Sequence, residues 1–380
     1  MQELKQSNTA FQEIKVWVLA PHLETTNSTI DYYYDFSQSI AEYTKTFAEL
    51  HIDWQWQPIT INNYKEIIDT IIATTINKQP VIFNLCDGDE IHGTPGVSII
   101  NYLEEKELLY TGSDAYFYNI TTSKLPMKMA FNKNNVATAS WQAIINKEQN
   151  IDNIFTALGC PLILKPAVSG GSMGVTVKSV VNNTTQLSDQ VHKMFESNKN
   201  WQLSTDGIIA EAFIDGPEFT VLIVGSYDSP EEAKIYTPVE RVFHSSLPAT
   251  EKFLSFDRLW ETYEEEEPMP NNENFYEYQM APIDLHEEIK SLAWGAYVAC
   301  RGKGYTRADI RMDAISKKMY VLEVNAQCGL SEDEDYTSIG AILKVSGTSF
   351  TQLVTQILEN TLAKSKNNYT ILLGNTVIVH

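Results

Sequence analysis

One stretch near the C-terminal end of the chain constrains the fold more than any other, because polar and apolar side chains alternate along it. Arginine and aspartate occupy every second position from Arg307 to Asp313, and Glu323 and Asn325 are flanked in the same way by apolar residues. A period of two is typical of β-strands that bury one face. A polar break at residues 316–318 separates the two runs, so we predict a β-hairpin.

Three side chains of this hairpin are candidate metal ligands. Asp309, Glu323 and Asn325 can share one face only if the connecting loop holds an odd number of residues or the hairpin contains a β-bulge, because a one-residue shift turns a strand over. Hard oxygen ligands on a rigid strand pair suit Mg²⁺. An ordinary solvated strand face is an alternative that these residues, taken alone, fit at least as well.

Composition indicates a globular protein and disfavours polyanionic partners. The 380 residues are 43% hydrophobic and 20% charged, which allows two or three packed subdomains. The formal charge of −21 opposes binding to nucleic acids and anionic membranes and attracts small cations. The four cysteines are scattered, the N-terminus lacks a signal segment, and no apolar run approaches the roughly 18 residues of a membrane span. We therefore predict a cytoplasmic location.

The N-terminal part of the chain predicts a parallel sheet. Buried strands are expected at residues 14–20 and 80–86, and apolar residues recur at helical spacing in residues 35–51 and 64–76. Alternation of strands and helices favours parallel pairing. An acidic, glycine-containing loop at residues 87–96 follows the second strand, where open α/β sheets bind ligands. A plain glycine-rich turn is the alternative.

A glycine-rich segment between two predicted strands is a candidate phosphate-binding lid. The first strand ends at Lys165, and the segment continues with Ser169, Gly170, Gly171 and Ser172. Glycines let backbone N–H groups approach phosphate oxygens, and the lysine adds a positive charge. The segment lacks the GxxxxGK[ST] pattern, and a hairpin without function also fits it.

The next strand, turn and strand, at residues 207–224, carry candidate nucleoside ligands. Glu211 and Glu218 bracket a Gly-Pro turn. Backbone groups of the segment Glu211, Ala212, Phe213 and Ile214 are placed to bind an adenine edge, the Phe213 ring to pack on the base, and Glu218 to bind ribose hydroxyls. Two surface glutamates beside a turn are the alternative.

Together these motifs resemble those of the ATP-grasp ligases, and among them the D-alanine–D-alanine ligases. The resemblance covers about residues 80–360 and rests on Lys124, Lys165 with its Gly/Ser loop, Glu211, the Gly-Pro-Glu at 216–218, Arg307 with Asp309, and Glu323 with Asn325. It implies a mixed α/β and α+β ATP-grasp fold with three subdomains, at residues 1–120, 121–206 and 207–380. The nucleotide is expected between the central and C-terminal lobes.

The resemblance also implies roles for the site residues. Lys124 and Lys165 would contact ATP phosphates, with Ser169, Gly170, Gly171 and Ser172 closing over them. The nucleoside would lie against Glu211, Ala212, Phe213, Ile214 and Glu218, and Asp309, Glu323 and Asn325 would bind Mg²⁺ or Mn²⁺. Arg307 would stabilise the phosphorylated tetrahedral species, and the Gly329 backbone N–H would be an oxyanion donor. The implied reaction phosphorylates a carboxylate with ATP, and an amine then displaces the phosphate.

Departures from the family pattern bear on the substrates. The N-terminal Gly-Ser-Glu motif for the first substrate's amine is missing, which leaves Glu24 or the 87–92 loop as substitutes, and Gly171 stands where serine is common. Acidic runs at residues 264–267 and 332–335 replace groups that hold a second carboxylate, where acids would favour a cation. Solvated loops without a role in binding are the alternative, which fits these runs equally well.

From the acidic runs we predict a ligase that joins a small-molecule carboxylate, such as an amino acid, to a cationic amine or basic amino acid. The alternatives are a D-alanine–D-alanine ligase, a non-catalytic ATP-binding regulatory module and an ATP-grasp kinase. We expect neither nucleic-acid nor membrane partners and leave a homodimer open.

Overall fold

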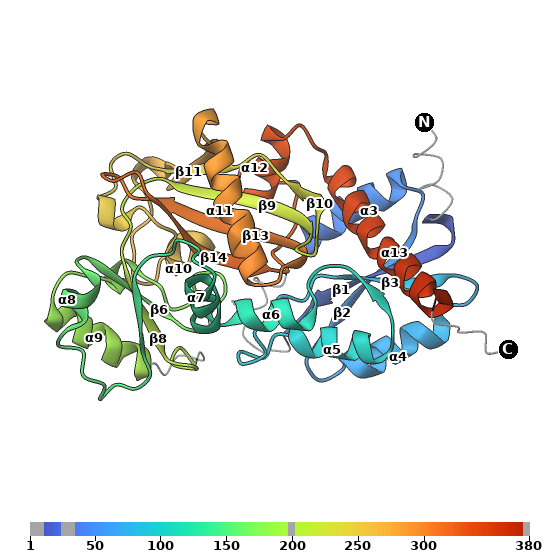
Figure 1. Ribbon diagram of the computed structural model, residues 1–380, viewed down its shortest axis with the longest axis horizontal. Coiled ribbons are helices and arrows are strands. Elements are labelled where there is room, and N and C mark those ends of the chain that lie inside the picture. The colour runs from blue at the N-terminus through green and yellow to red at the C-terminus, as the bar shows by residue number, and fades with distance from the viewer. Residues whose placement is uncertain (1–10, 24–34, 197–201, 375–380) are drawn as a thin grey trace.

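The computed structural model describes residues 11–23, 35–196 and 202–374, which form three lobes, each built around its own sheet (Figure 1). The organisation in three subdomains expected from the sequence is therefore present. Within these ranges, no helix combines the length and the apolar character needed to cross a membrane.

The N-terminal lobe contains the predicted parallel sheet, with strand order β2-β1-β3-β4. Alternate residues of β1 pack on opposite faces: Val16 packs in a cluster with Phe47, and Leu19 packs in another with Ile68. Burial on both faces explains why these strands read as unbroken apolar runs. The elements are β1 (Ile14–Pro21), α3 (Ser37–Glu49), β2 (Asp53–Ile59), α4 (Tyr64–Thr74), β3 (Gln79–Asn84), α5 (Val97–Glu105), β4 (Leu109–Tyr110) and α6 (Ala115–Thr122).

The central lobe contains an antiparallel sheet with strand order β5-β8-β6-β7. Leu164 and Ala210 face a core that includes α9, so the alternation of the strands turns Lys165 and Glu211 to the opposite face. The elements are α7 (Lys124–Lys133), β5 (Trp141–Ile144), α8 (Ile154–Leu158), β6 (Leu162–Pro166), η1 (Val177–Ser179), β7 (Val180–Val181), α9 (Thr184–Phe195) and β8 (Ile208–Ala212).

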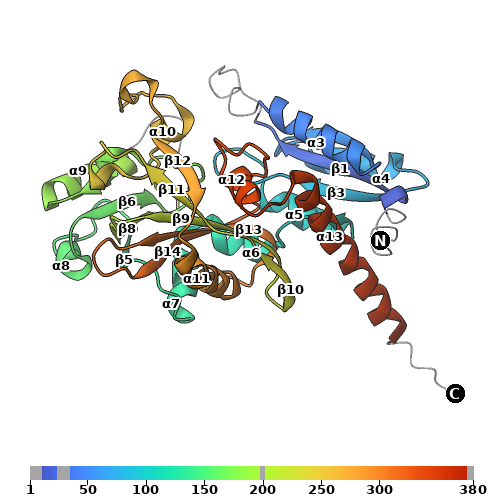
Figure 2. The ribbon, with the colours of Figure 1, turned by 90° about the horizontal axis from the view of Figure 1, so that it is seen from above.

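The C-terminal lobe is built on a six-stranded sheet with order β12-β11-β9-β13-β14 and β10 paired to β9. Helix α11 covers one face, and α12 and α13 pack toward the N-terminal lobe (Figure 2). The elements are β9 (Glu218–Ser226), β10 (Ser229–Ile235), β11 (Val239–Phe243), η2 (Ala249–Glu251), α10 (Phe256–Trp260), η3 (Pro270–Asn272), β12 (Tyr276–Met280), η4 (Ile283–Leu285), α11 (His286–Ala299), β13 (Lys303–Met312), β14 (Met319–Ala326), α12 (Ser338–Val345) and α13 (Phe350–Gly374).

The predicted hairpin is β13 and β14, and it contains a register shift. Asp309 pairs with Glu323, whereas the next residue, Ile310, pairs with Val321. Leu322 is therefore the extra residue of a β-bulge. Without this bulge, Leu322 instead of Glu323 would stand opposite Asp309, and the two carboxylates would point to opposite faces.

Two segments differ from what their composition suggests. Residues 255–282 are rich in acidic and aromatic residues and are expected from the sequence to form a long loop, whereas they contain α10, η3 and β12. Residues 369–380 resemble an added strand in sequence, but this prediction is wrong as far as residue 374, because α13 extends to Gly374. Residues 375–380 lie outside the described part.

Candidate active site

A cavity of about 410 Å³ lies between the central and C-terminal lobes and gathers every residue that the sequence singled out for the site. The lining includes all sixteen of them, which are Lys124, Lys165, Ser169, Gly170, Gly171, Ser172, Glu211, Ala212, Phe213, Ile214, Glu218, Arg307, Asp309, Glu323, Asn325 and Gly329. They come from α7, β6, the lid, β8, β9, the hairpin and the loop after it. Residues as far apart in sequence as Lys124 and Gly329 thus meet in one place.

The three candidate metal ligands converge on the hairpin. Asn325 Nδ2 donates hydrogen bonds to Asp309 Oδ2 at 3.1 Å and to Glu323 Oε1 at 3.4 Å. Among the described residues, no group of three or more His, Cys, Asp or Glu side chains is arranged to hold a metal ion, so the candidate set depends on the Asn325 amide. The amide nitrogen faces the two carboxylates here, and Asn325 would bind a metal through its oxygen. The two carboxylates with that oxygen would be a hard donor set that fits Mg²⁺ or Mn²⁺.

Arg307 lies beside this set and is paired with Asp309. Its Nη2 is 3.0 Å from Asp309 Oδ2, and Thr220 Oγ1 donates to Asp309 Oδ1 at 3.0 Å. Burial lowers the pKa of Arg307, but the Asp309 carboxylate more than offsets this effect and raises it, so the guanidinium stays charged. An anion that enters the cavity therefore meets a fixed cation.

A buried ion cluster stands behind the candidate phosphate site. Glu211 lies between Lys165, at 2.8 Å, and Lys128, at 2.5 Å, and the side chains of Glu211 and Lys128 are 2% and 0% exposed. Burial alone would raise the pKa of Glu211, but the two lysines lower it to about 2. The sequence reading missed Lys128, although its position four residues after Lys124 places both lysines on one helix face.

The glycine-rich lid is held in place from two sides. Lys124 Nζ donates to the backbone oxygen and to Oγ of Ser169, both at 3.1 Å. On the other side, Trp260 Nε1 of α10 donates to the Gly171 oxygen at 2.9 Å, and Ser172 Oγ donates to the Leu254 oxygen at 2.9 Å. The segment that read as a long loop is thus a packed strap over the lid.

Glycine at position 171 has a structural reason. Its φ of +53° lies in the left-handed region, and a Cβ there would lie 2.9 Å from Cζ2 of the Trp260 ring. A serine would meet both a strained backbone conformation and a steric clash. The departure from the usual serine is therefore coupled to the tryptophan of the strap.

Arginines that the sequence reading did not assign to the site surround the candidate nucleoside position. Glu218 forms an ion pair with Arg241 and lies 3.7 Å from Nε of Arg311. The Arg311 guanidinium also stacks 5.3 Å from the Phe213 ring centroid. Arg311 belonged to the polar face of the predicted hairpin, whereas nothing in the sequence around Arg241 distinguishes it from a surface strand residue.

The two acidic runs do not support a cationic second substrate. No residue of 264–267 or 332–335 lines the 410 Å³ cavity or a second cavity, of about 460 Å³, that adjoins it. At least four of their eight acids are paired with nearby cations: Glu265 lies 2.9 Å from Lys193 and Glu266 lies 3.0 Å from Arg258, while Glu332 and Glu334 pair with Lys45 and Lys344 at 3.0 and 2.6 Å. The charge runs are structural, so they give no preference for a cation.

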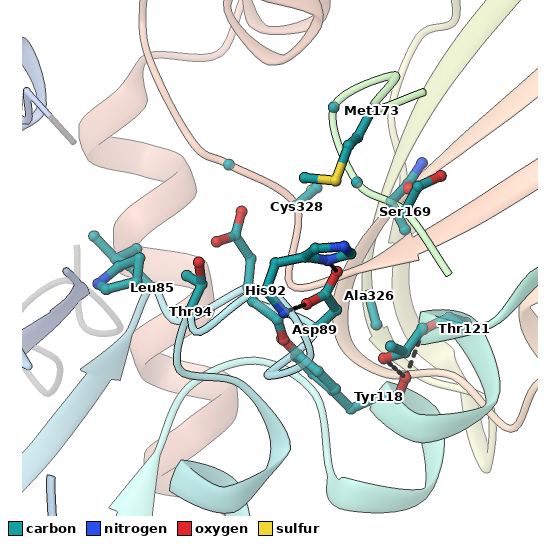
Figure 3. Close-up of a pocket in the computed structure, with 18 of the residues that line it drawn as sticks. Leu85, Asp89, His92, Thr94, Tyr118, Thr121, Ser169, Met173, Ala326 and Cys328 are labelled. Atoms are coloured by element: carbon teal, nitrogen blue, oxygen red, sulfur yellow. Dashed lines mark hydrogen bonds and ion pairs between the residues drawn. The ribbon is translucent and has the colours of Figure 1, made fainter. Parts of the chain in front are cut away.

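A second cavity, of about 460 Å³, adjoins the first at the lid and at the loop after β14. Figure 3 shows its wall, with Asp89 and His92 from the 87–96 loop, Tyr118 and Thr121 from α6, and Ser169 and Met173 from the lid. His92 Nδ1 is 2.6 Å from Asp89 Oδ2. The 87–92 loop, one of the two suggested substitutes for the missing motif, therefore reaches this cavity, and Glu24, the other, lies outside the described residues.

Comparisons with known proteins identify the family. Residues 130–359 match the family model described as the C-terminus of D-Ala–D-Ala ligase. The D-alanine–D-alanine ligase of Cupriavidus necator is 28% identical over 270 residues, which cover 70% of this chain and 73% of the relative. That of Idiomarina loihiensis is 25% identical over 280 residues, which cover 72% and 79%.

Solved structures agree in fold. The structure of the D-alanine–D-alanine ligase from Bacillus anthracis complexed with ATP has a TM-score of 0.64 at 17% identity and covers 93% of this chain and 99% of its own. The chain therefore belongs to the D-Ala–D-Ala ligase family of ATP-grasp proteins and is an ADP-forming carbon–nitrogen ligase.

Proposed function

We propose that the chain joins the carboxylate of one amino acid to the amine of another while ATP is converted to ADP and phosphate, as the names of its relatives indicate for D-alanine. The observation that carries the proposal is the common cavity, in which all sixteen residues suggested by the family motifs meet. Local pairing of the acidic loops removes the reason to prefer a cationic amine over an amino acid.

The proposed phosphoryl transfer uses the charges of this cavity. Lys124 and Lys165 neutralise the ATP phosphates, and the lid N–H groups close over them. Asp309, Glu323 and Asn325 would hold Mg²⁺ or Mn²⁺, which when bound supplies further neutralisation of phosphate charge. Arg307 is placed beside the same set, at 3.0 Å from Asp309, and stabilises the carboxylate as it accepts the phosphoryl group.

The nucleoside is proposed to lie against Glu211, Ala212, Phe213 and Ile214. Ribose hydroxyls would donate hydrogen bonds to the Glu218 carboxylate, which Arg241 holds in place. The Phe213 ring meets Phe253 edge to face and lies against the Arg311 guanidinium, and these two contacts fix its orientation.

The proposed second step is attack of an amine on the acyl phosphate. The new C–N bond forms as the C–O bond to phosphate breaks, and the ammonium loses a proton to solvent or to a base. The Gly329 N–H is proposed to bind the oxyanion, and a Cβ built at Gly329 meets no atom within 4 Å, so a substrate group has room there. A closed lid keeps water from the acyl phosphate.

The experiment is ADP and phosphate release with ATP and Mg²⁺ over pairs of D- and L-amino acids, followed by mass spectrometry of the products. We expect ADP, phosphate and a condensed product that has lost one water. ATP binding without turnover for every pair would instead support a non-catalytic module, and a stable phosphorylated product a kinase.

A further inference from the structure

We propose that the 460 Å³ cavity binds the amino acid whose carboxylate is activated, and that this amino acid has an apolar side chain larger than the methyl group of alanine. This inference rests on the proposed function and names its first substrate class. Three features of the cavity carry it: its position, its charge and its size.

The position of the cavity places a bound carboxylate next to the nucleotide site. Both cavities are lined by Ser169, Gly171, Asn325 and Gly329, so they meet at the lid and at the end of the hairpin. A molecule whose carboxylate lies at this junction can accept a phosphoryl group there, while the rest of it occupies the second cavity.

The charge at the junction favours an α-ammonium group. Asp87, the third residue after β3, lines both cavities, and its side chain is exposed to them. Asp89 is engaged elsewhere, because it pairs with His92, whose Nε2 in turn accepts a hydrogen bond from the Gln202 N–H at 3.2 Å. Asp87 is therefore the acid placed to face the ammonium of an amino acid whose carboxylate points to Asn325.

The size and lining of the cavity exceed what alanine requires. Its volume of about 460 Å³ lies within the roughly 300–1,000 Å³ of sites that hold drug-sized ligands. Away from Asp87 the wall contains apolar side chains from three lobes, including Pro21, Leu23, Phe36, Leu85, Met173 and Leu330. Polar groups such as Ser39, Thr94 and Thr122 line other parts of the wall, so an apolar substrate side chain would be stabilised by burial against the apolar part.

Parts of this wall are rigid and one part is adaptable. Phe36 packs against Trp56 with ring centroids 5.5 Å apart, and Leu330 is buried in the core between the N- and C-terminal lobes. Met173 belongs to the lid and faces the cavity from the side opposite Leu85 (Figure 3). A methionine, whose unbranched side chain has three rotatable bonds, suits substrate side chains that differ in shape.

The test compares kcat/KM for ADP release across single amino acids and their pairs, from alanine to leucine, methionine and phenylalanine in both configurations. In apolar pockets a single methylene changes discrimination by about 10- to 200-fold. We therefore expect at least one large apolar amino acid to exceed alanine of the same configuration by more than about tenfold. If alanine is the best substrate, the size inference is overturned and the proposed function stands. If no amino acid supports ADP release, the proposed function fails, and this inference with it.

Two variants separate the parts of the inference. Ser39→Trp narrows the cavity from α3, and Ala41→Trp adds the same ring on an exposed position of the same helix. We expect Ser39→Trp to lower kcat/KM for the large amino acid at least about tenfold and to change alanine by less than about threefold, while Ala41→Trp matches the wild type. Equal loss for both substrates in Ser39→Trp would contradict the assigned position of the side chain.

Asp87→Asn tests the ammonium contact. The wild type is expected to have a higher kcat/KM for an amino acid than for the carboxylic acid that lacks only the amine. Asp87→Asn is expected to reduce the ratio of these two kcat/KM values at least about tenfold without raising the KM for ATP. An unchanged preference would remove Asp87 from substrate binding.

Discussion

Replacement of Glu211 by glutamine is the most informative single change, because this carboxylate holds two lysines in a buried cluster. Its pKa falls from an ordinary value of 4.5 to about 2 in the folded protein. At about 1.4 kcal/mol per pH unit, this fall corresponds to roughly 3 kcal/mol of unfolding free energy. Loss of one member of a buried ion pair independently costs about 3–5 kcal/mol. We therefore expect Glu211→Gln to be less stable by roughly 3 kcal/mol at pH 7.

The pH dependence of this difference has a fixed sign. Glu211 binds a proton less readily when folded than when unfolded, so its stabilisation is full above about pH 4.5 and is lost as the pH falls toward 2. Urea unfolding monitored by circular dichroism should show the wild type and Glu211→Gln converging over that window. Glu277→Gln, on the exposed side of β12, is the matched control and should stay within about 0.5 kcal/mol of the wild type.

Two results would refute this reasoning. A Glu211→Gln protein within about 0.5 kcal/mol of the wild type at pH 7 would mean that the cluster does not stabilise the fold. A stability difference that does not change between pH 7 and pH 2.5 would mean that Glu211 is not the titrating group.

Three further changes follow from the site. Asp309→Asn should lower ADP release by at least about 100-fold while the circular dichroism spectrum stays that of the wild type, and full activity would exclude Asp309 as a metal ligand. Trp260→Ala should release ADP in excess over condensed product, because the lid loses its contact with the strap and water reaches the acyl phosphate. Trp260→Phe should give an ADP-to-product ratio between those of the wild type and Trp260→Ala. Equal ratios in all three proteins would exclude a role of Trp260 in closing the lid. Gly171→Ser should raise the KM for ATP through the clash with Trp260, and restored binding in Gly171→Ser/Trp260→Ala would show that the two positions are coupled.

The hairpin illustrates how much of the site could be predicted from the sequence. The alternation of polar and apolar residues specified two strands and one polar face, and the requirement that Asp309 and Glu323 share that face demanded an odd loop or a bulge. The structure contains the bulge, at Leu322. Local spacing sufficed because strand periodicity and pairing register determine which way each side chain points.

Other site residues could not be found in this way, because their role depends on contacts between distant segments. Arg241 is an ordinary strand residue until β11 lies beside β9 and brings it to Glu218. Trp260 lies in a stretch whose composition resembles a loop, and only its contact with the Gly171 oxygen reveals a strap. The acidic runs misled for the same reason, since Lys45 and Lys193, their partners, come from other helices.

The overall charge of the chain shows why composition alone is a poor guide to the ligand of this site. A formal charge of −21 suggests repulsion of a nucleotide. The described lining of the nucleotide cavity, however, contains five cationic side chains, Lys124, Lys165, Arg241, Arg307 and Arg311, and five acidic ones, Asp87, Glu211, Glu218, Asp309 and Glu323. Charges farther away than about 8 Å are largely screened at physiological ionic strength, so the balance inside the cavity decides. Glu211 pairs with Lys128 and Lys165, Glu218 with Arg241, and Asp309 with Arg307, so buried cations neutralise these carboxylates. Lys124, which donates to the Ser169 oxygens, adds a positive charge that an anion meets in the cavity. An acidic protein thus binds a polyanion wherever buried partners neutralise its local carboxylates.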